Sequence, residues 1–457
     1  MKDDKIREPV LIANGQGFWG DSIDAPIKLI EGGPLHYITL DYLAEVTMSI
    51  MQRQKLRNPQ KGYATDFVDL MHETLPRLVE KNIKVIASAG GVNPKACREA
   101  VLEVARKLGL KGVKIGIVEG DDILERLPGL LAAGASLKNM DNGEALTSIQ
   151  EKVLSANVYI TSFAIAEALQ QGAQIIITGR VSDPGLVLAP MIYEFGWKED
   201  EWDKLAAGTV AGHILECGAQ ATGGNYSRWW EVPDFANIGY PIAEGYPDGS
   251  FFVTKHPDTG GMVTVDTVAE QIVYEMGDPK NYISPDVRID FTSIQLEQAG
   301  KDRVKVFGIK GYPKTDSYKV SINYQKGYKT SGTLTISGPD AYAKAQKCAA
   351  IIWQRLRNAG YTFEETSTEF LGVNSCHGDI NPLPAQINEV VLRVGVKDVD
   401  EKKVERFGKE IAPLVTNGPP GVTGFAGGRP KPQEIVAYWP ALIDKKLIQA
   451  KVTVEEV

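Results

Sequence analysis

The chain has 457 residues, of which 43% are hydrophobic and 24% are charged, as in an ordinary globular protein with two or three domains. Its formal net charge of −8 disfavours nucleic-acid binding, because no strong basic field would offset the phosphates. No apolar run approaches the roughly 20 residues that cross a bilayer, and the first residues lack the apolar core of a signal peptide, so we expect a cytoplasmic protein without a membrane segment.

The first half of the chain alternates strand and helix patterns. Expected strands cover residues 10–13, 37–40, 84–87, 113–118, 158–160 and 174–178, and expected helices cover residues 43–54, 66–80, 95–108 and 163–171. This alternation predicts an α/β fold with a doubly wound, mostly parallel sheet, and a closed barrel is the alternative.

Glycine-rich loops follow several of these strands. Residues 14–21 carry Gly at positions 15, 17 and 20, a spacing that matches the loop of dinucleotide-binding proteins. A tight turn, or a loop that brings a ligand close to backbone N–H groups, is the alternative. Candidate substrate-binding residues in the loops after the first and third strands are Asn14, Gly15, Gly17, Asp21, Gly90, Gly91 and Asn93.

Acidic residues also follow predicted strands. Asp41 is placed to act as a carboxylate base and shares a helix face with Glu45, although Asp41 would equally cap that helix. The adjacent Asp121 and Asp122 are weak candidates for binding a divalent cation through oxygen ligands. Side chains of neighbouring residues diverge in many loops, so both are equally compatible with a solvated turn.

The segment at residues 175–184 is the clearest strand-to-helix junction. Three consecutive isoleucines suit a strand that is covered on both faces. Asp183 and Pro184 then predict the start of a helix. Arg180 stands between them at the carboxyl end of the strand, where open α/β sheets bind their ligands. We therefore expect Arg180 to bind a carboxylate or phosphate and Asp183 to line the same cleft.

Residues 212–225 gather an imidazole, a carboxylate and a thiol before a flexible glycine-rich loop that ends at Asn225. We predict His213, Glu216 and Cys217 as candidate catalytic residues and Asn225 as a further substrate-binding residue. A lone cysteine is more often a small buried hydrophobe. The four cysteines of the chain lie far apart without a CxxC pair, which favours reduced thiols.

The second half has a different texture. Expected strands cover residues 251–253, 262–265, 304–306, 318–322 and 332–336, and a helix is expected over residues 340–357. These patterns predict an α+β domain with a largely antiparallel sheet. We accordingly divide the chain into an N-terminal α/β domain with the ligand cleft, residues 1–235, and a C-terminal α+β domain, residues 236–457.

Several blocks of the sequence resemble the acyclic terpene utilisation (AtuA-like) family. They lie, in this order, at residues 12–21, 32–34, 41–45, 62–64, 89–94, 178–184 and 216–218. The resemblance runs over most of the chain and is strongest before about residue 270. It implies a role in the bacterial catabolism of branched acyclic terpenoids and related acids. It also implies a separate small ferredoxin-like partner protein, because such a domain often accompanies or is fused to members of the family.

The leading hypothesis is a catabolic enzyme that acts on a branched carboxylate or its acyl-CoA thioester by lyase or hydratase chemistry. Arg180 would be the anion anchor, Asp41 or His213 the acid/base group, and backbone N–H groups around Gly15 and Gly90–Gly91 the donors to an oxyanion. The alternatives are a non-catalytic scaffold or ligand-binding subunit, and a nucleotide-dependent enzyme that uses the Gly15 loop. No cofactor is required, CoA enters only as part of a substrate, and a homo-oligomer is expected.

Overall fold

The computed structural model describes residues 9–373, 375–380, 382–383, 386–423 and 428–457. The first residues, where the sequence shows no signal-peptide core, lie outside this description. The chain folds into two compact units, residues 1–323 with 438–457 and residues 324–437, and the boundaries fall inside strands β14 (Ser317–Ser337) and β18 (Gln433–Asp444). In the part of the chain described, no helix is both long and apolar enough to cross a membrane.

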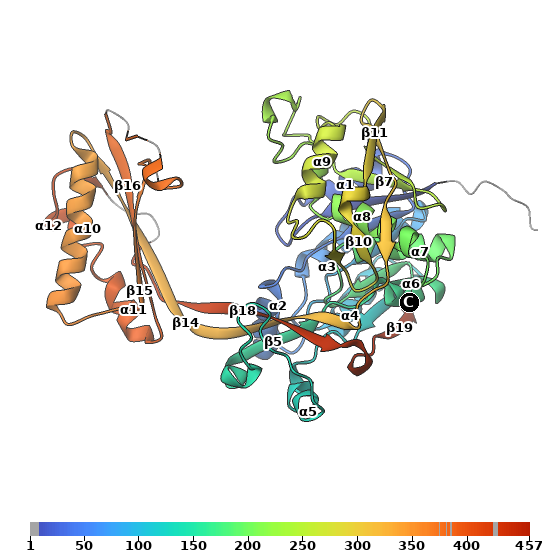
Figure 1. Ribbon diagram of the computed structural model, residues 1–457, viewed down its shortest axis with the longest axis horizontal. Coiled ribbons are helices and arrows are strands. Elements are labelled where there is room, and N and C mark those ends of the chain that lie inside the picture. Colours follow the sequence, from blue (N-terminus) through green and yellow to red (C-terminus); the bar gives the residue numbers. More distant parts are fainter. Residues whose placement is uncertain (1–8, 374, 381, 384–385, 424–427) are drawn as a thin grey trace, which may run out of the picture. The chain divides into compact units, whose positions relative to one another are not determined.

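A ten-stranded sheet forms the centre of the first unit (Figure 1). Its middle is parallel, as predicted, and the bounds of these strands match the expected ones closely. In spatial order they are β1 (Val10–Gln16), β2 (Tyr37–Leu40), β3 (Lys84–Ala87), β6 (Ile175–Thr178) and β4 (Lys114–Glu119). The sheet is open, so the closed barrel is wrong.

Antiparallel strands extend this sheet on both sides. Beyond β4 lies β19 (Lys451–Glu456), and beyond β1 lie β7 (Pro241–Gly245), β8 (Phe251–Lys255), β12 (Arg303–Phe307) and β11 (Gln295–Gly300). The boundary that the sequence suggests at residue 235 therefore does not coincide with the division into two units. Five strands after that residue, β7, β8, β11, β12 and β19, complete the N-terminal sheet instead of starting a new one.

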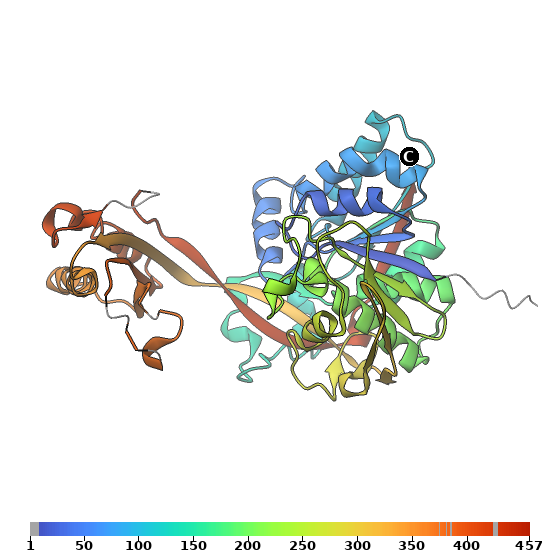
Figure 2. The ribbon, with the colours of Figure 1, turned by 90° about the horizontal axis from the view of Figure 1, so that it is seen from above.

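Helices cover both faces of the sheet, which makes it doubly wound as predicted (Figure 2). One face packs against α1 (Asp24–Gly32), α3 (Thr65–Glu80) and α4 (Pro94–Lys107), and the other against α6 (Ser162–Gln170), α7 (Gly185–Phe195) and α8 (Trp202–Leu215). Strand β6 is buried on both sides, because Ile175 and Ile177 enter one core and Ile176 the other. The isoleucine run therefore marks a central strand, as the sequence indicates.

Two expected strands of the first unit differ from the structure. The segment 158–160 lies at the end of β5 (Val153–Val158), which pairs with β14 and does not join the parallel sheet. The strand expected at residues 262–265 is wrong. Helix α9 (Val265–Val273) begins there, because Thr264 and Thr267 form a reciprocal capping box that satisfies backbone N–H groups at the helix start.

The remaining short elements of the first unit surround the sheet. They are α2 (Thr47–Arg57), α5 (Leu127–Ala132), β9 (Tyr282–Ile283), β10 (Arg288–Asp290) and β13 (Lys310–Tyr312), of which the last three form a small antiparallel sheet. The segment around β9 matters for the candidate site, because it forms part of its wall.

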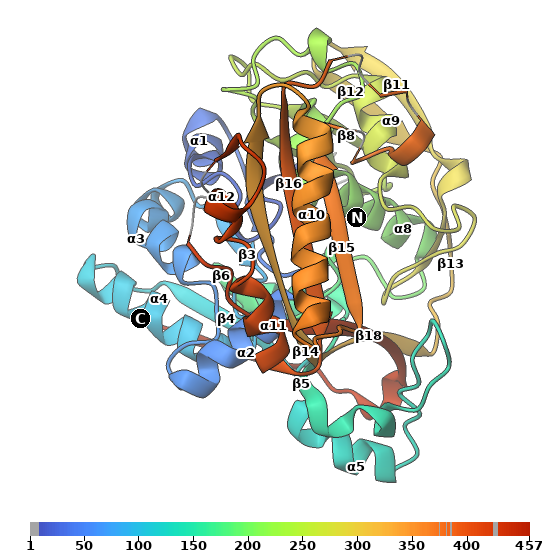
Figure 3. The same ribbon diagram turned by 90° about the vertical axis from the view of Figure 1, so that its left-hand side faces the viewer.

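The second unit is an antiparallel sheet with helices on one face (Figure 3). Its strands β15 (Glu365–Leu371), β16 (Glu389–Asp398), β17 (Val422–Thr423) and the distal part of β14 pair antiparallel. The helices are α10 (Ala341–Asn358), α11 (Glu401–Gly408) and α12 (Leu414–Asn417). The helix at 340–357 and the antiparallel α+β character of this part are thus confirmed.

Candidate functional site

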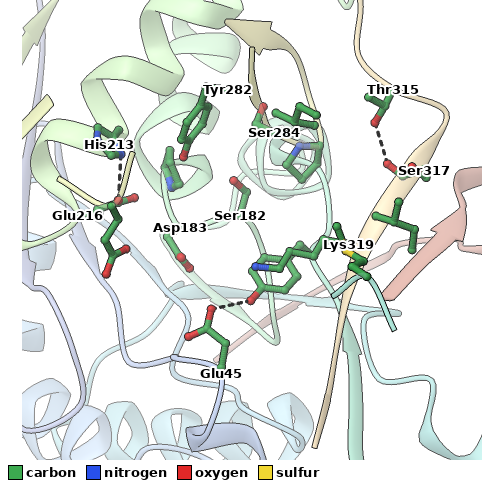
Figure 4. A pocket seen from close by; sticks show the side chains of 17 residues that line it. Glu45, Ser182, Asp183, His213, Glu216, Tyr282, Ser284, Thr315, Ser317 and Lys319 are labelled. Carbon is green, nitrogen blue, oxygen red and sulfur yellow. Dashed lines mark hydrogen bonds and ion pairs between the residues drawn. The ribbon is translucent and has the colours of Figure 1, made fainter. Parts of the chain in front are cut away.

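A cavity of about 480 Å³ opens at the carboxyl ends of β2 and β6, the edge of the sheet at which the sequence predicts the active site (Figure 4). Every residue that lines it belongs to the first unit. Its polar wall carries the carboxylates Glu45, Asp183, Glu216 and Glu275, and its apolar wall includes Met140, Ile283 and Leu442. The size and the mixed wall are typical of a small-molecule site.

Arg180 is not one of the residues that line this cavity, although its ion-pair partner Asp183 is. It is 2% exposed, and its Nη1 donates to the carbonyl of Leu43 at 2.7 Å and lies 2.8 Å from the carboxylate of Asp183. The guanidinium also lies over the ring of Tyr159, 4.3 Å from the centroid. The fork of donors that the sequence assigns to a substrate anion is therefore directed at groups of the protein itself.

Asp183 faces the cavity, with 35% of its side chain exposed. The sequence places Asp183 at the start of a helix, but the N-cap residue of α7 is Pro184, and the side chain of Asp183 pairs with Arg180. Burial raises the pKa of Asp183 to about 7, with the charges of Asp41 and Glu45 acting in the same direction and Arg180 opposing them. A carboxyl that titrates near neutral pH is suited to accept and return protons.

His213 and Glu216 form a pair at the end of α8, with His213 Nδ1 3.2 Å from Glu216 Oε1. The other nitrogen of His213, Nε2, lies 3.2 Å from the carbonyl of Ile272. Because a carbonyl oxygen only accepts, Nε2 carries a hydrogen, whereas Nδ1 lies near Glu216 without a well-formed hydrogen bond among the described residues. His213 and Glu216 both line the cavity, and Glu216 has a second oxygen, Oε2, without a hydrogen-bond partner among the described residues, so the catalytic role predicted for each of them stays a prediction.

The surroundings of His213 and Glu216 shift the pKa values of both groups. Burial raises the pKa of Glu216, and the charges of Asp183 and Glu275 add to the effect. Burial alone would lower the pKa of His213, but the hydrogen bond and the charge of Glu216 outweigh it and raise the value. The surroundings therefore raise the pKa of both members of the pair above the ordinary value of each group.

Asn14 explains why Glu216 stands where it does. Its Nδ2 donates to the carbonyls of Leu215, at 2.6 Å, and Glu216, at 3.0 Å, and so ties the end of α8 to the end of β1. Asn14 is 1% exposed. The residue predicted to bind substrate is thus a buried support of the site, one step behind the carboxylate that lines the cavity.

A second polar group comes from residues on three other segments. The hydroxyl of Tyr159 donates to Glu45 Oε1 at 3.2 Å, and the ammonium of Lys319 lies 5.0 Å from the centre of the Tyr159 ring. Burial would raise the pKa of Glu45, but its hydrogen bonds and the positive charges of Arg180 and Lys319 lower it. Glu45 therefore carries a negative charge beside Lys319, whereas Asp183 and Glu216 retain protons more readily.

The sequence model of the acyclic terpene utilisation family protein AtuA matches residues 10–454, nearly the whole chain. The chain belongs to this family. Searches of curated proteins and of solved structures give no match. Membership in the AtuA family confirms the resemblance drawn from the sequence blocks and connects the chain with acyclic terpene utilisation.

In this AtuA-family chain the Gly15 loop is closed by the protein itself. The N–H of Gly17 donates to Asp21 Oδ2 at 2.9 Å, and the hydroxyl of Tyr240 donates to Asp21 Oδ1 at 2.6 Å. A Cβ on Gly15 would lie 3.0 Å from Pro26. The carboxylate of Asp21 thus accepts the hydrogen bond of an N–H group at which a pyrophosphate would bind. Of the three interpretations of this loop, a dinucleotide-binding loop, a ligand-binding loop and a tight turn, the geometry favours the tight turn.

The loop after β3 also serves the fold. The N–H of Gly90 donates to the carbonyl of Thr178 at 2.9 Å, and Gly91 has a φ of 53° in the left-handed region. Asn93 precedes Pro94 at the start of α4, but its side chain donates to the carbonyls of Pro59 and Lys61. The residues that line the cavity do not include four of the predicted substrate-binding residues: Gly90, Gly91, Asn93 and the exposed Asn225.

Two predicted catalytic residues lie next to the cavity without lining it. Asp41 is 5% exposed and accepts hydrogen bonds from Ser88 Oγ at 2.6 Å and from the N–H of Leu43 at 3.1 Å. Burial raises the pKa of Asp41, and Arg180 opposes the shift. Burial and the charge of Glu216 raise the pKa of Cys217 to about 12, so this sulfur is a thiol at neutral pH and the environment does not activate it as a nucleophile.

The side chains of Asp121 and Asp122 accept hydrogen bonds from backbone N–H groups and do not converge on a point where a metal ion could bind. Asp121 accepts from the N–H of Arg180 at 2.8 Å and from Asn157 at 3.0 Å, while Asp122 accepts from the N–H of Leu124 at 3.1 Å. Among the residues that the structure describes, no group of three or more His, Cys, Asp or Glu side chains is arranged to hold a metal ion. The arrangement accordingly does not support the weak metal candidates.

Asp121 gives a testable pH dependence. Burial, with the charge of Asp122, raises its pKa to about 7. Between pH 4 and 7 the folded protein therefore keeps a proton that the unfolded chain releases, so the free energy of unfolding falls as pH rises through this interval. In Asp121→Asn, which does not titrate, the fall between pH 5 and pH 8 is expected to be smaller by about 2 kcal/mol.

The measurement is urea unfolding at several pH values. Asp69→Asn, on the exposed side of α3, is the control and should follow the wild-type profile. Equal slopes of stability against pH in wild type and Asp121→Asn would show that Asp121 is already ionised at pH 5.

Sequence reasoning missed Tyr159, Lys319, Glu275 and Tyr282, and it named Glu45 only as a neighbour of Asp41. One signal existed for Lys319: Ser317 and Lys319 at the start of β14, and Thr315 just before it, occupy alternate positions and all line the cavity. Alternate residues of a strand share a face. A strand that carries polar residues at every second position there, before an apolar stretch, is compatible with a site wall.

Proposed function

We propose that the chain is a catabolic lyase or hydratase that acts on a branched carboxylate or its acyl-CoA thioester in acyclic terpene utilisation. The observation that carries the proposal is the pair of proton-holding carboxyls, Asp183 and Glu216, on the wall of one cavity of mixed polarity. Elimination of water and cleavage of a carbon–carbon bond next to a hydroxyl both need a base and an acid at opposite ends of the reacting bond.

In the hydratase form, ionised Asp183 takes the proton from the carbon next to the carbonyl. The electron pair forms the double bond, the carbon–oxygen bond of the hydroxyl breaks, and protonated Glu216 gives its proton to the departing hydroxide, which leaves as water. Hydration runs through the same steps in reverse. Lys319 and the hydroxyls of Ser182 and Tyr282, which also line the cavity, would stabilise the negative charge that develops on the carbonyl oxygen.

The lyase form uses the same two groups in different order. The base takes the proton of the substrate hydroxyl, the carbon–carbon bond breaks, and the acid protonates the carbanion. No redox partner is needed for either reaction. The four cysteines are free, which fits the cytoplasmic location that we propose along with this role.

The test is turnover by the purified protein. Branched β-hydroxy acids, the corresponding enoic acids and the CoA thioesters of both are incubated with it, and gain or loss of water or chain cleavage is followed by mass spectrometry. We expect turnover of at least one substrate, lowered at least tenfold in Glu216→Gln. Glu80→Gln, exposed at the end of α3, is the matched control. Absence of turnover with every compound would remove the proposal.

The structure bears differently on the two alternative functions, a nucleotide-dependent enzyme and a non-catalytic ligand-binding subunit. The nucleotide-dependent enzyme loses its support, because Asp21 takes an N–H group of the Gly15 loop. A non-catalytic ligand-binding subunit would bind the same compounds without turning them over, and substitution of Asp183 would leave the pathway intact. The small ferredoxin-like partner and the homo-oligomer stay predictions that co-purification and light scattering would check.

A further inference from the structure

We propose that the cavity binds its substrate as a free monocarboxylate and that Lys319, not Arg180, holds the carboxylate group. This inference rests on the proposed function, and it decides between the two substrate forms that the function leaves open. Lys319 is the only Lys or Arg among the described residues that line the cavity. A substrate anion therefore has one positive partner on that wall.

The ammonium of Lys319 is available for this role. In the described part of the chain it makes no ion pair and no hydrogen bond, although it lies over the rings of Tyr159, at 5.0 Å, and Tyr438, at 5.8 Å. These rings hold the side chain in place without using its three donors. Figure 4 shows Lys319 extending from β14 toward the side of the cavity that carries Asp183 and Glu45.

Arg180 differs in each of these respects. Its Nη1 already donates to the carbonyl of Leu43 and pairs with Asp183, and the side chain is 2% exposed. Arg180 does not line the cavity, and a substrate carboxylate that paired with Nη1 or Nη2 would have to displace Asp183 and leave that carboxylate without its partner. Ser317, two residues before Lys319 on the same face of β14, adds a hydroxyl group to the wall of the cavity.

The other carboxylates on the wall decide how much charge the cavity accepts. The raised pKa values of Asp183 and Glu216 reduce the negative charge that these two groups add to the wall, and Glu45, whose pKa is lowered, and Glu275 are the other two carboxyl groups there. One lysine balances the single charge of a carboxylate. It does not balance the several phosphate charges of CoA, and no further Lys or Arg lines the described wall to receive them.

The experiment compares three ligands of one carbon skeleton by isothermal titration calorimetry: a branched ten-carbon enoic acid, its primary alcohol and its CoA thioester. We expect the acid to bind at least tenfold more tightly than the alcohol. Lys319→Ala should weaken binding of the acid about 10- to 100-fold and leave binding of the alcohol unchanged, and Lys319→Arg should restore most of the affinity.

Lys310→Ala is the matched control, because Lys310 is an exposed lysine paired with Asp203 outside the cavity, and it should bind the acid as wild type does. Equal affinities for acid and alcohol, or no effect of Lys319→Ala, would overturn the inference. If the thioester is turned over and the acid is neither bound nor turned over, the inference fails while the proposed function stands. If no compound is bound or turned over, both fail.

Discussion

Asp183→Asn is expected to lower kcat by 10²- to 10⁴-fold, the range typical of losing a group that transfers a proton in the transition state. The amide keeps the size of the side chain, and its carbonyl oxygen still accepts a hydrogen bond from Arg180. What is lost is the ability to take up and release a proton near pH 7, where burial and the charges of Asp41 and Glu45 place the pKa of this carboxyl.

The pH profile separates this role from a structural one. In wild type, the base form of Asp183 appears as pH rises through about 7, so the activity should rise over that interval. Asp183→Asn should keep a low rate without this limb, and thermal unfolding should show that the variant is folded. Asp200→Asn, on an exposed loop, should retain both rate and profile. A residual rate that still rises through pH 7 would assign the base to another residue.

The sequence predicts those parts of the fold in which a short run of neighbouring residues already shows which side chains are buried. The isoleucine run of β6 and the alternation of strands and helices before it indicate a central parallel sheet, and the structure has it. Of the antiparallel strands after residue 235 that extend this sheet, the sequence predicts β8 and β12 but not β7, β11 or β19. Their membership in the same sheet depends on pairing between β7 and β1, which joins residues about 230 positions apart that no local pattern relates.

The site could be predicted as a place but only partly as a set of residues. Asp183, which follows β6, lies at the cavity as expected from the strand ends, whereas Glu216 reaches the cavity from the end of helix α8. The same argument could not show that Arg180 turns its guanidinium under the cavity toward Asp183, since this depends on where Tyr159 and Leu43 lie. Lys319 comes from a strand about 140 residues further along the chain, so proximity in sequence gave no indication of it.

Arg180→Met is expected to destabilise the protein by about 3 to 5 kcal/mol, because it leaves buried partners of a lost charge uncompensated. Methionine fills much of the volume of the side chain but donates no hydrogen bond. The carbonyl of Leu43 would lose its 2.7 Å donor, Asp183 would lose its ion pair, and Asp41 would lose the positive charge that opposes the rise of its pKa. Urea unfolding at pH 8 measures the loss.

The dependence of this loss on pH follows from the same contacts. At pH 8 Asp183, with a pKa of about 7, is ionised and the guanidinium stabilises its charge, whereas at pH 5 Asp183 holds a proton and needs the guanidinium less. The destabilisation by Arg180→Met should therefore be smaller at pH 5 than at pH 8. Arg77→Met, which removes a half-exposed ion pair with Glu31, should cost about 1 kcal/mol or less at either pH. If Arg180→Met and Arg77→Met lower the free energy of unfolding by the same amount, the buried contacts of Arg180 do not stabilise the protein as expected. Arg180 would then have to be reconsidered as a substrate anchor.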